Sequence, residues 1–397
     1  MKDQETLPLA GLTVVSIEQA VAAPLATRHL ADWGARVIKI ERPGTGDFAR
    51  AYDTQVKGLS SYFVWLNRSK ESLTLDLKRP EAAQVVARIV AGADVLVHNL
   101  APGAMDRLGL AAATLRARHP RLIMCAVSGY GSSGPYRDRK AYDLLVQSEA
   151  GLLSITGTPE TPAKAGISVA DIAAGMYAYS AILTALVRRS ATGDGAGLEV
   201  SMLDALGEWM GHAFYASVYG GSPLPRSGAR HASIAPYGPF PGGDGGTVYL
   251  GIQNEREWQR FCREVLAQPA LADDPRFVTN TRRVEHRDEM EAAIGEVFGS
   301  LTTAEIVVRL DAAEIAHARL NTVEEFAAHP QLAARRRWRE IDSPAGPLRA
   351  LSPPVVMDAL EPAMGAVPTL GEHTETILGE LGYDRATIAG WREAGVI

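Results

Sequence analysis

The chain has 397 residues, of which 46% are apolar and 22% charged, a composition typical of globular proteins. Its 40 basic and 46 acidic residues give a net charge of −6, which argues against a nucleic-acid partner. A site for an anionic ligand must therefore be built from a local cluster of Arg and Lys, and the length suffices for about two or three domains.

Three features of the sequence bear on the cellular compartment of the protein and on its association with membranes. Cys125 and Cys262 lie far apart without the spacing of a metal site, which fits a reducing cytoplasm. The N-terminal MKDQETLPLAGL is too polar for a signal peptide. Residues 172–187 form an apolar run of 16, shorter than the ~20 residues of a membrane span, so we expect a helix buried on nearly all sides. The sequence thus predicts a cytoplasmic protein with no membrane partner and no metal.

The first half of the chain alternates apolar strands with helical segments. Strands are predicted over 12–18, 35–41, 72–77, 94–99 and 121–129, with helices over 23–34 and 80–91. This alternation predicts an α/β fold with a mainly parallel sheet. Because such sheets bind ligands at the carboxyl ends of their strands, the loops after residues 18, 41, 99 and 129 should surround a site.

A dinucleotide site is disfavoured in this sheet. Glu41 closes the second strand and resembles the ribose-binding acid of a Rossmann fold. The turn after the first strand, EQAVAAP, contains no glycine, so the backbone cannot approach a pyrophosphate in the usual way.

The second half changes character at RSGARHASIAPYGPFPGGDGG (226–246), where glycine, proline and short β-like pieces dominate. The strand TVYLGI and the helix EREWQRFCREVL follow, and two helices, HTETILGELG and DRATIAGWREAG, end the chain. We predict a large domain over 1–222, a smaller α+β domain over 223–325, and a return to the large domain over 326–397.

Three loops combine glycines with cations at strand ends. They are PGTGDFAR (43–50), HNLAPGAMDRLGL (98–110) and SGYGSSGPYRDRKAYD (128–143). Each alone is better explained by turn chemistry and solvated charge. Together they suit a bulky anionic ligand whose phosphates are held by cations.

Asp171 stands at the head of the long apolar run, within GISVADIAAGMYA (166–178). Helix starts leave N–H groups unpaired, and either Ser168 or Asp171 could cap this one. A chemical role for the carboxylate is the alternative.

Seven segments, in order, resemble the family III CoA-transferases, which include formyl-CoA, carnitine and dicarboxylate CoA-transferases and α-methylacyl-CoA racemases. The matching segments are GARVIKIERPGTGD, NRSKESLTLDLKRPE, HNLAPGAMDRLGL, SGYGSSGPYRDRKAYD, VADIAAGMYA, TGDGAGLEVSMLDA and PTLGEHTETILGELGY. The resemblance runs nearly end to end. It implies an interlaced, ring-linked homodimer whose Rossmann-like large domain is made from both chain ends.

The resemblance also implies that Asp171 is the nucleophile and that acyl-CoA is a substrate, with no tightly bound cofactor. Asp171 would attack the thioester to give an acyl-aspartyl anhydride and CoA thiolate. CoA then reaches the acceptor through an aspartyl-CoA thioester, or the first acid stays bound until the acceptor enters. A carboxylate nucleophile keeps every intermediate a high-energy acyl species. We expect the N–H groups at the helix start to keep Asp171 ionised.

Other roles carry over by position. The residues implied to contact CoA are Ala20, Val21, Pro24, Arg42, Asn99, Leu100, Ala104, Arg107, Lys140 and Tyr142. Tyr142 and Asp143 are also implied to lie near the acyl group.

Two departures from the patterns of family members narrow the expected activity. The racemases carry a catalytic histidine where this chain has Tyr142, whose unperturbed pKa near 10 suits it poorly as a base. The oxalate-handling enzymes carry a run of consecutive glycines where this chain reads GARHASIAPYGPF (228–240). The absence of that run argues against a formyl-CoA:oxalate activity.

The same segment offers Arg226, Arg230 and His231, which could hold the second carboxylate of a dicarboxylate, although they could equally be surface and turn residues. The resulting expectation is transfer from succinyl-CoA to an acid such as mesaconate, itaconate, citramalate or glutarate. Carnitine-type or formyl-CoA-type transfer, a racemase-like isomerase and an inactive CoA-binding protein remain as alternatives.

Overall fold

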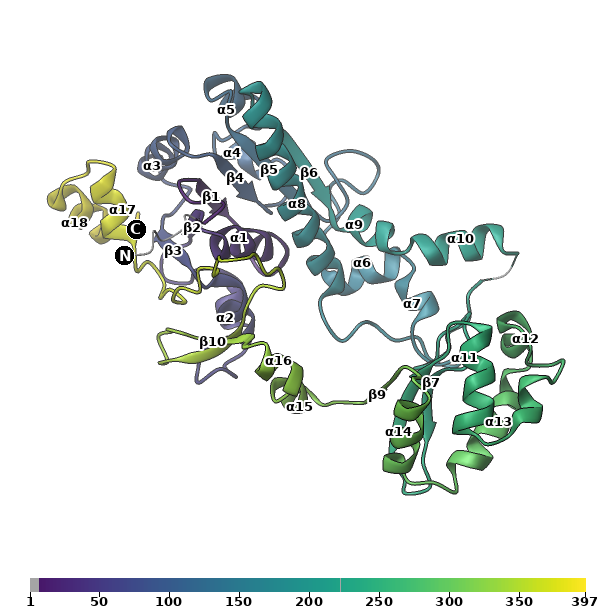
Figure 1. Cartoon of the computed structure of the whole chain (residues 1–397). Coiled ribbons are helices and arrows are strands. Elements are labelled where there is room, and N and C mark those ends of the chain that lie inside the picture. The colour runs from purple at the N-terminus through teal and green to yellow at the C-terminus, as the bar shows by residue number, and fades with distance from the viewer. Residues whose placement is uncertain (1–6, 222) are drawn as a thin grey trace. The chain divides into compact units, whose positions relative to one another are not determined.

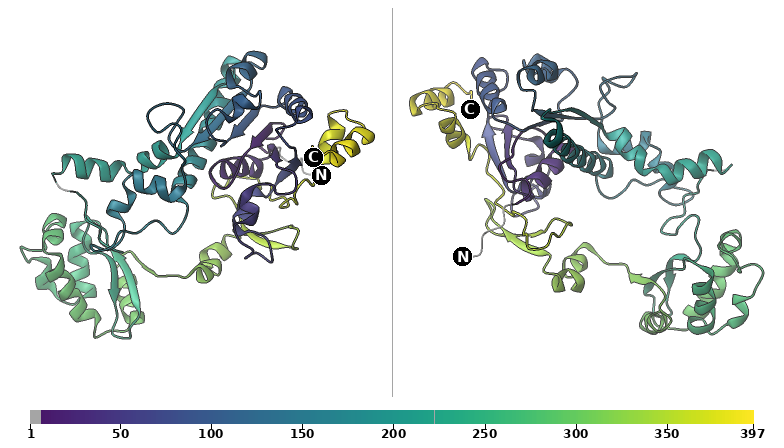
Figure 2. Two further views of the ribbon diagram at one scale, coloured as in Figure 1. Left: turned by 180° about the vertical axis from the view of Figure 1, so that it is seen from behind. Right: turned by 45° about the horizontal axis from the view of Figure 1, so that its top comes forward.

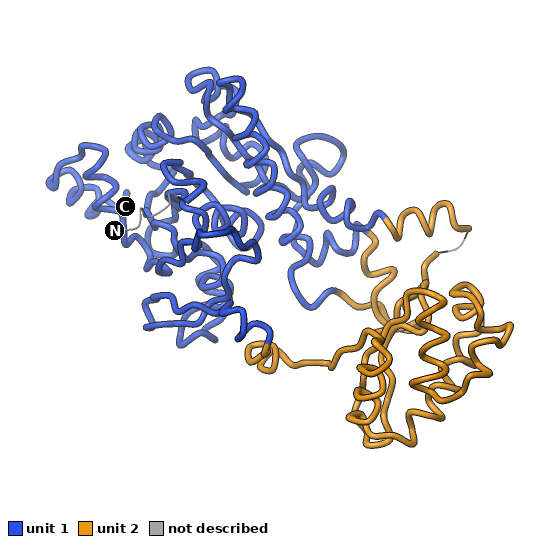
Figure 3. Tube along the Cα trace, in the orientation of Figure 1, with its two compact units in different colours: residues 1–150, 165–211, 331–397 blue, residues 151–164, 212–330 orange. Residues whose placement is uncertain are grey.

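The computed structural model describes residues 7–221 and 223–397, which divide into two compact units (Figure 3). Unit 1 comprises the chain up to Ala150, Ala165–Gly211 and Gln331–Ile397, and unit 2 comprises Gly151–Lys164 and His212–Pro330. Unit 2 therefore includes a short segment, 151–164, that lies well before the predicted small domain. Residues 1–6 and 222, which belong to the predicted 1–222 domain, lie outside the described residues.

Unit 1 is built on a six-stranded sheet in the order β3-β2-β1-β4-β5-β6, with every pair parallel (Figure 1). The strands are β1 (Thr13–Ile17), β2 (Arg36–Glu41), β3 (Lys70–Thr74), β4 (Val95–His98), β5 (Ile123–Ser128) and β6 (Gly197–Ser201). The predicted parallel sheet is confirmed, and β6 adds a strand that was not predicted. Since β1 and β4 are neighbours whose connections leave in opposite directions, the strand order reverses between them, where open α/β sheets bind ligands.

Helices cover both faces of the sheet because successive strand residues point to opposite sides. Val14 packs with α1 (Ala22–Asp32), α8 (Val169–Thr192) and α9 (Met202–Trp209). Val15 packs with α3 (Pro80–Ala91), α17 (Thr374–Glu380) and α18 (Arg385–Glu393). The C-terminal helices thus lie beside the first strands of the chain (Figure 2), where Thr374 Oγ1 accepts a hydrogen bond from the Thr74 N–H at 3.0 Å.

Helix α8 differs from the prediction. It has 24 residues rather than 16, and it is buried along one stripe rather than on nearly all sides. The buried stripe includes Ala170, Ala174, Ala178 and Ile182, spaced by four, whereas Val187 on another face is 71% exposed. By length and composition alone α8 could cross a membrane, which is weak evidence because core helices of globular proteins pass the same test.

Small residues let α8 approach α1 closely. A Cβ added at Gly175 would lie 2.6 Å from the carbonyl oxygen of Ala22, nearer than real side chains come. This contact fixes the first turns of α8, and Asp171 with them, against the start of α1.

Unit 2 contains the antiparallel sheet β7 (Tyr237–Pro241), β8 (Thr247–Gly251) and β9 (His317–Arg319). Its core includes the buried rings of Trp258, Phe261 and Phe298. The single helix predicted for EREWQRFCREVL is α11 (Glu255–Arg260) followed by a π-helical turn, Phe261–Val265.

Shorter elements complete both units. The 3₁₀ turns are η1 (Phe48–Ala51) and η3 (Pro269–Ala272), and the small hairpin is β10 (Trp338–Ile341) with β11 (Leu348–Leu351). The remaining helices are α2 (Ser61–Asn67), α4 (Ala104–Arg107), α5 (Ala112–Arg118), α6 (Asp143–Glu149), α7 (Leu152–Ile155), α10 (Gly211–Tyr219), α12 (Asn280–Glu285), α13 (Arg287–Phe298), α14 (Thr303–Ala312), α15 (Val323–Ala327) and α16 (Pro330–Ala334).

Candidate active site

The turn after β1 is fixed by residues that follow two neighbouring strands. Ala20 has a φ of 63°, in the left-handed region. The Gln19 N–H donates to Asn99 Oδ1 at 2.8 Å, and Asn99 Nδ2 donates to the Gln19 carbonyl at 2.8 Å. Asn99, expected to contact CoA, therefore ties this turn to the end of β4 across the point where the strand order reverses.

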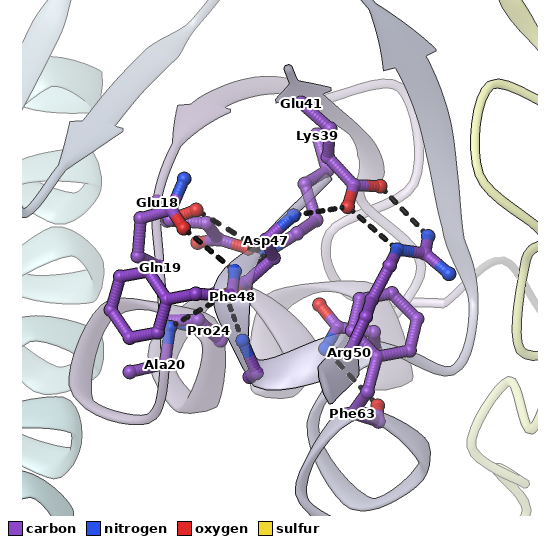
Figure 4. A network of polar contacts seen from close by, with 12 residues as sticks. Glu18, Gln19, Ala20, Pro24, Lys39, Glu41, Asp47, Phe48, Arg50 and Phe63 are labelled. Atoms are coloured by element: carbon purple, nitrogen blue, oxygen red, sulfur yellow. Dashed lines mark hydrogen bonds and ion pairs between the residues drawn. The ribbon is translucent and has the colours of Figure 1, made fainter. Parts of the chain in front are cut away.

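Asp47, in the loop after β2, holds the other side of the turn (Figure 4). Its Oδ1 accepts from the Ala20 N–H at 3.0 Å and from the Ala49 N–H at 2.9 Å. Its Oδ2 accepts from Lys39 Nζ at 2.8 Å, with both side chains fully buried. No role was predicted for Asp47, although it lies in the loop 43–50, one of those expected to surround the site.

A second carboxylate shares this buried charge. Glu18 lies 3.5 Å from Lys39 Nζ and 2.8 Å from Lys70 Nζ. Burial opposes ionisation of Glu18, but Lys70 and then Lys39 outweigh it and hold its pKa below the usual value. Two buried ion pairs therefore lie beside the turn after β1: Lys39 with Asp47, and Lys70 with Glu18.

Glu41 is fully engaged within the protein. Its Oε1 accepts from the Asp47 N–H and Arg50 Nε, and its Oε2 accepts from Arg50 Nη2 and Ser72 Oγ. Burial raises its pKa, but the Arg50 hydrogen bond and Lys39 dominate and lower it to about 2. No oxygen of Glu41 is left for a ribose, which supports the exclusion of a dinucleotide.

The start of α8 is capped from another helix. Asp143 Oδ1, at the start of α6, accepts from the N–H groups of Ala170 at 2.8 Å and Asp171 at 3.3 Å. Its Oδ2 accepts from the buried Gln147 at 2.6 Å. Ser168 makes no capping bond, so the expected cap from Ser168 or Asp171 is replaced by one from Asp143.

Asp171 is consequently less acidic than expected. Its side chain is half-buried, and burial together with the nearby Asp143 carboxylate raises its pKa to about 7. The expectation that N–H groups keep it ionised is wrong, because those groups serve Asp143. A carboxylate with this pKa is poised to react when it loses its proton near neutral pH.

The turn after β1 meets the start of α8 in a small apolar cluster. Val21, Leu25 and Leu66 are buried together, and Ala20, Tyr62 and Ile172 pack against them. Ala20 and Val21 therefore share a cluster with the residue that follows Asp171. Pro24, also predicted to contact CoA, directs its carbonyl to Lys70 Nζ at 3.0 Å.

Two exposed tyrosines, Tyr142 and Tyr52, interact electrostatically with each other, and Tyr52 also interacts with Asp171. Tyr142 immediately precedes α6 and is 66% exposed. Partial burial, the carboxylates of Asp47 and Asp171, and the Tyr142 hydroxyl raise the pKa of Tyr52 to about 12. Tyr142 was predicted in this region, whereas nothing in the sequence indicated Tyr52.

A cavity of about 550 Å³ lies at the carboxyl ends of β4 and β5. Leu100 and Arg107 line it, as does Arg137 from the glycine-rich loop. His98 forms part of the same wall, where burial lowers its pKa to about 4 and keeps it neutral. Of the other predicted residues, Ala104 begins α4, while Arg42 and Lys140 are exposed.

In unit 2 the predicted acid-binding residues have partners. Arg230 Nε makes hydrogen bonds of 2.9 and 2.8 Å with the two oxygens of Glu291. Arg226 donates to the carbonyls of Thr158 and Pro159 in the 151–164 segment. The His231 ring stacks on Tyr237 with a centroid separation of 5.3 Å. An acid at Arg230 would have to compete with Glu291.

No group of three or more His, Cys, Asp or Glu able to hold a metal occurs within residues 7–221 and 223–397. Both cysteines are buried and unpaired, and burial raises the pKa of each thiol to about 12. These thiols are poor nucleophiles at neutral pH.

Comparison with known proteins shows the family to which the chain belongs. The model of CoA-transferase family III matches residues 9–374. The succinate–glutarate CoA-transferase of Agrobacterium fabrum is 34% identical, covering 94% of this chain and 96% of that protein. The acetyl-CoA:oxalate CoA-transferase of Acetobacter aceti is 37% identical, covering 83% and 84%. The crystal structure of a CAIB/BAIF family protein from Brucella suis superposes with a TM-score of 0.82 at 32% identity, covering 95% of this chain and all of that one. The chain belongs to CoA-transferase family III, and it is a CoA-transferase.

Proposed function

We propose that this enzyme moves CoA from a donor such as succinyl-CoA to a small dicarboxylate, with Asp171 as the nucleophile. The observation that carries the proposal is the Asp171 carboxylate itself, half-buried on the first turn of α8 with a pKa of about 7. The next residue, Ile172, packs in one cluster with Ala20 and Val21 of the turn after β1, in the sheet region where α/β folds bind ligands.

The reaction is a sequence of acyl transfers at one carboxylate. An Asp171 oxygen attacks the thioester carbonyl, the C–S bond breaks, and CoA leaves as a thiolate from an acyl-aspartyl anhydride. The thiolate then attacks the aspartyl carbonyl, which releases the donor acid and forms an aspartyl-CoA thioester. The acceptor carboxylate reverses these steps and restores Asp171, with no net uptake of protons.

Unit 1 offers a place for the nucleotide end of CoA. Arg107 and Arg137 approach the 550 Å³ cavity from two loops, and guanidinium groups bind phosphates through paired hydrogen bonds. Leu100 supplies apolar surface there, while the exposed Arg42 and Lys140 are placed for outer contacts. The Ala20–Pro24 turn, next to α8, would direct the pantetheine arm toward Asp171.

Asp143 takes a different role from the one first expected. Its two oxygens are already engaged by the α8 N–H groups and by Gln147, so it positions Asp171 and tunes its pKa rather than holding the acid. Tyr142, adjacent and exposed, remains a candidate contact for the acyl group.

The acceptor is proposed to be a dicarboxylate because relatives at 34% and 37% identity are named for glutarate and oxalate. Arg230 and His231 stay candidates for its second carboxylate. A free acid would displace Glu291 from Arg230, exchanging one bidentate carboxylate for another.

We further propose the interlaced homodimer typical of the family. Helix α10 is evidence for a partner copy because it exposes large apolar side chains. They are Phe214, Tyr215, Val218 and Tyr219, which are 51%, 66%, 58% and 74% exposed, respectively. An aromatic surface of this kind is characteristic of protein interfaces.

An acid panel tests the proposed function. Succinyl-CoA incubated with glutarate, citramalate, mesaconate or itaconate is expected to give the corresponding new acyl-CoA by mass spectrometry, whereas butyrate, with one carboxylate, should react poorly. Failure of every acid, together with exchange of the α-proton in a 2-methylacyl-CoA, would contradict transfer and establish an isomerase.

The pH dependence of kcat/KM should reflect the ionisation of Asp171. Because the reactive form is the carboxylate, kcat/KM is expected to rise about tenfold per pH unit up to a midpoint near 7 and then to level off. Asp143→Asn keeps an oxygen to cap α8 but removes the neighbouring charge, so the midpoint should move to lower pH. An unchanged midpoint in this variant would contradict the electrostatic coupling.

A further inference from the structure

The N–H groups at the start of α8 are all occupied, although a helix N-terminus normally leaves them open to an anion. The Val169 N–H donates to the Ile167 carbonyl at 2.8 Å, those of Ala170 and Asp171 to Asp143 Oδ1, and that of Ile172 to the Ser168 carbonyl at 2.9 Å. The end of the helix therefore has no free donor for a negative charge that develops beside Asp171.

Attack by Asp171 nevertheless creates such a charge. When the carboxylate adds to a thioester, the carbonyl π electrons move onto oxygen, and acyl-transfer enzymes stabilise this oxyanion with hydrogen-bond donors placed in advance. The backbone at the start of α8 has no free N–H for this oxyanion, so a side chain near Asp171 is the candidate donor.

An aromatic stack connects Tyr52 to the apolar cluster at the start of α8. Tyr52 follows η1, and its ring meets Tyr62 edge-on, with centroids 5.4 Å apart and an interplanar angle of 87°. Phe48 packs on it at 5.6 Å. Tyr62 in turn packs on the apolar cluster that includes Ile172, the residue after Asp171. The stack therefore links the Tyr52 ring to the start of α8.

The Tyr52 hydroxyl keeps its proton under working conditions. Partial burial and the carboxylates of Asp47 and Asp171 raise its pKa to about 12, so it keeps its proton and can donate throughout the neutral pH range in which Asp171 ionises. The ring is 48% exposed, which leaves it open to a bound substrate.

We propose that the Tyr52 hydroxyl donates the hydrogen bond that stabilises the oxyanion formed when Asp171 attacks the thioester. This assignment rests on the proposed function. An Asp171 lone pair forms the new C–O bond, and the carbonyl π pair moves to oxygen, where it accepts the hydrogen bond. The pair then returns, the C–S bond breaks, and CoA leaves as a thiolate while the Tyr52 proton stays on the phenol.

Single-turnover kinetics with Tyr52→Phe test the proposal. The variant keeps the ring and its packing, so CoA affinity and melting temperature should be unchanged, while adduct formation with succinyl-CoA should slow about 100-fold. Tyr62→Phe is the matched control: it loses a hydroxyl from the same stack and should form adduct at the wild-type rate.

The possible results distinguish failure of the Tyr52 assignment from failure of the proposed function. If wild-type enzyme forms the adduct and Tyr52→Phe forms it equally fast, the Tyr52 assignment is overturned and the proposed function stands. An equal slowing in Tyr62→Phe would also overturn it, because the effect would then belong to the stack. If wild-type enzyme forms no Asp171 adduct with any acyl-CoA, the proposed function fails first.

Discussion

Replacing Asp171 with asparagine is expected to lower kcat by about 10⁴-fold or more, since loss of the nucleophile removes the covalent route entirely. The amide is nearly the same size, so binding of free CoA should be retained. Steady-state rates and CoA titrations of the two proteins check both expectations. Turnover within tenfold of wild type would contradict a nucleophilic Asp171.

The same substitution should stabilise the fold above neutral pH. The folded protein binds the Asp171 proton more tightly than the unfolded chain, since its pKa rises from 3.8 to about 7. The ionised side chain therefore lowers stability progressively as the pH rises from about 4 to 7 and fully above 7. At pH 8, Asp171→Asn should raise the free energy of unfolding by about 2 kcal/mol, with little gain at pH 4. A loss of stability at pH 8 would contradict this view.

Lys39→Met is expected to cost about 3–5 kcal/mol of unfolding free energy, because it leaves a buried carboxylate without its cation. Lys39 Nζ lies 2.8 Å from Asp47 and 3.5 Å from Glu18, all three side chains being fully buried. Asp47 also anchors the Ala20 N–H, so the turn beside α8 should loosen and the KM for acyl-CoA should rise. Denaturant unfolding and steady-state kinetics measure the two effects.

A second substitution provides the control. Asp47→Asn in the Lys39→Met background removes the unpaired charge and keeps an oxygen that can accept from the Ala20 N–H. The double variant should recover at least about 1 kcal/mol relative to the single one. No recovery would show that Lys39 acts through packing instead of charge.

The central sheet could be predicted because buried parallel strands leave a strong apolar signal. Strands near Thr13–Ile17, Arg36–Glu41 and Val95–His98 appear as predicted, and α3 has the predicted bounds, Pro80–Ala91. In contrast GLEVS lacks a continuous apolar run, because exposed and half-buried residues alternate in β6 up to the buried Ser201. Helix α8 is longer than the predicted 16 residues because its ends are polar, and it is buried on one side only.

The surroundings of the candidate nucleophile could not be predicted. The place of Asp171 ahead of an apolar run and the family resemblance make it a candidate, but the cap of α8 comes from Asp143, 27 residues before Ala170. Likewise Arg230 meets Glu291 across 61 residues of sequence. Such pairings, and the pKa values they set, depend on long-range folding that spacing along the chain does not encode.

Trapping the covalent intermediate tests the central claim most directly. The enzyme is incubated with succinyl-CoA without an acceptor, treated with hydroxylamine, digested and mapped by mass spectrometry. A hydroxamate on Asp171 that requires succinyl-CoA is the predicted result, since hydroxylamine captures an aspartyl carbonyl activated as an anhydride or thioester. A hydroxamate on another residue, or none in enzyme that still turns over, would contradict the account.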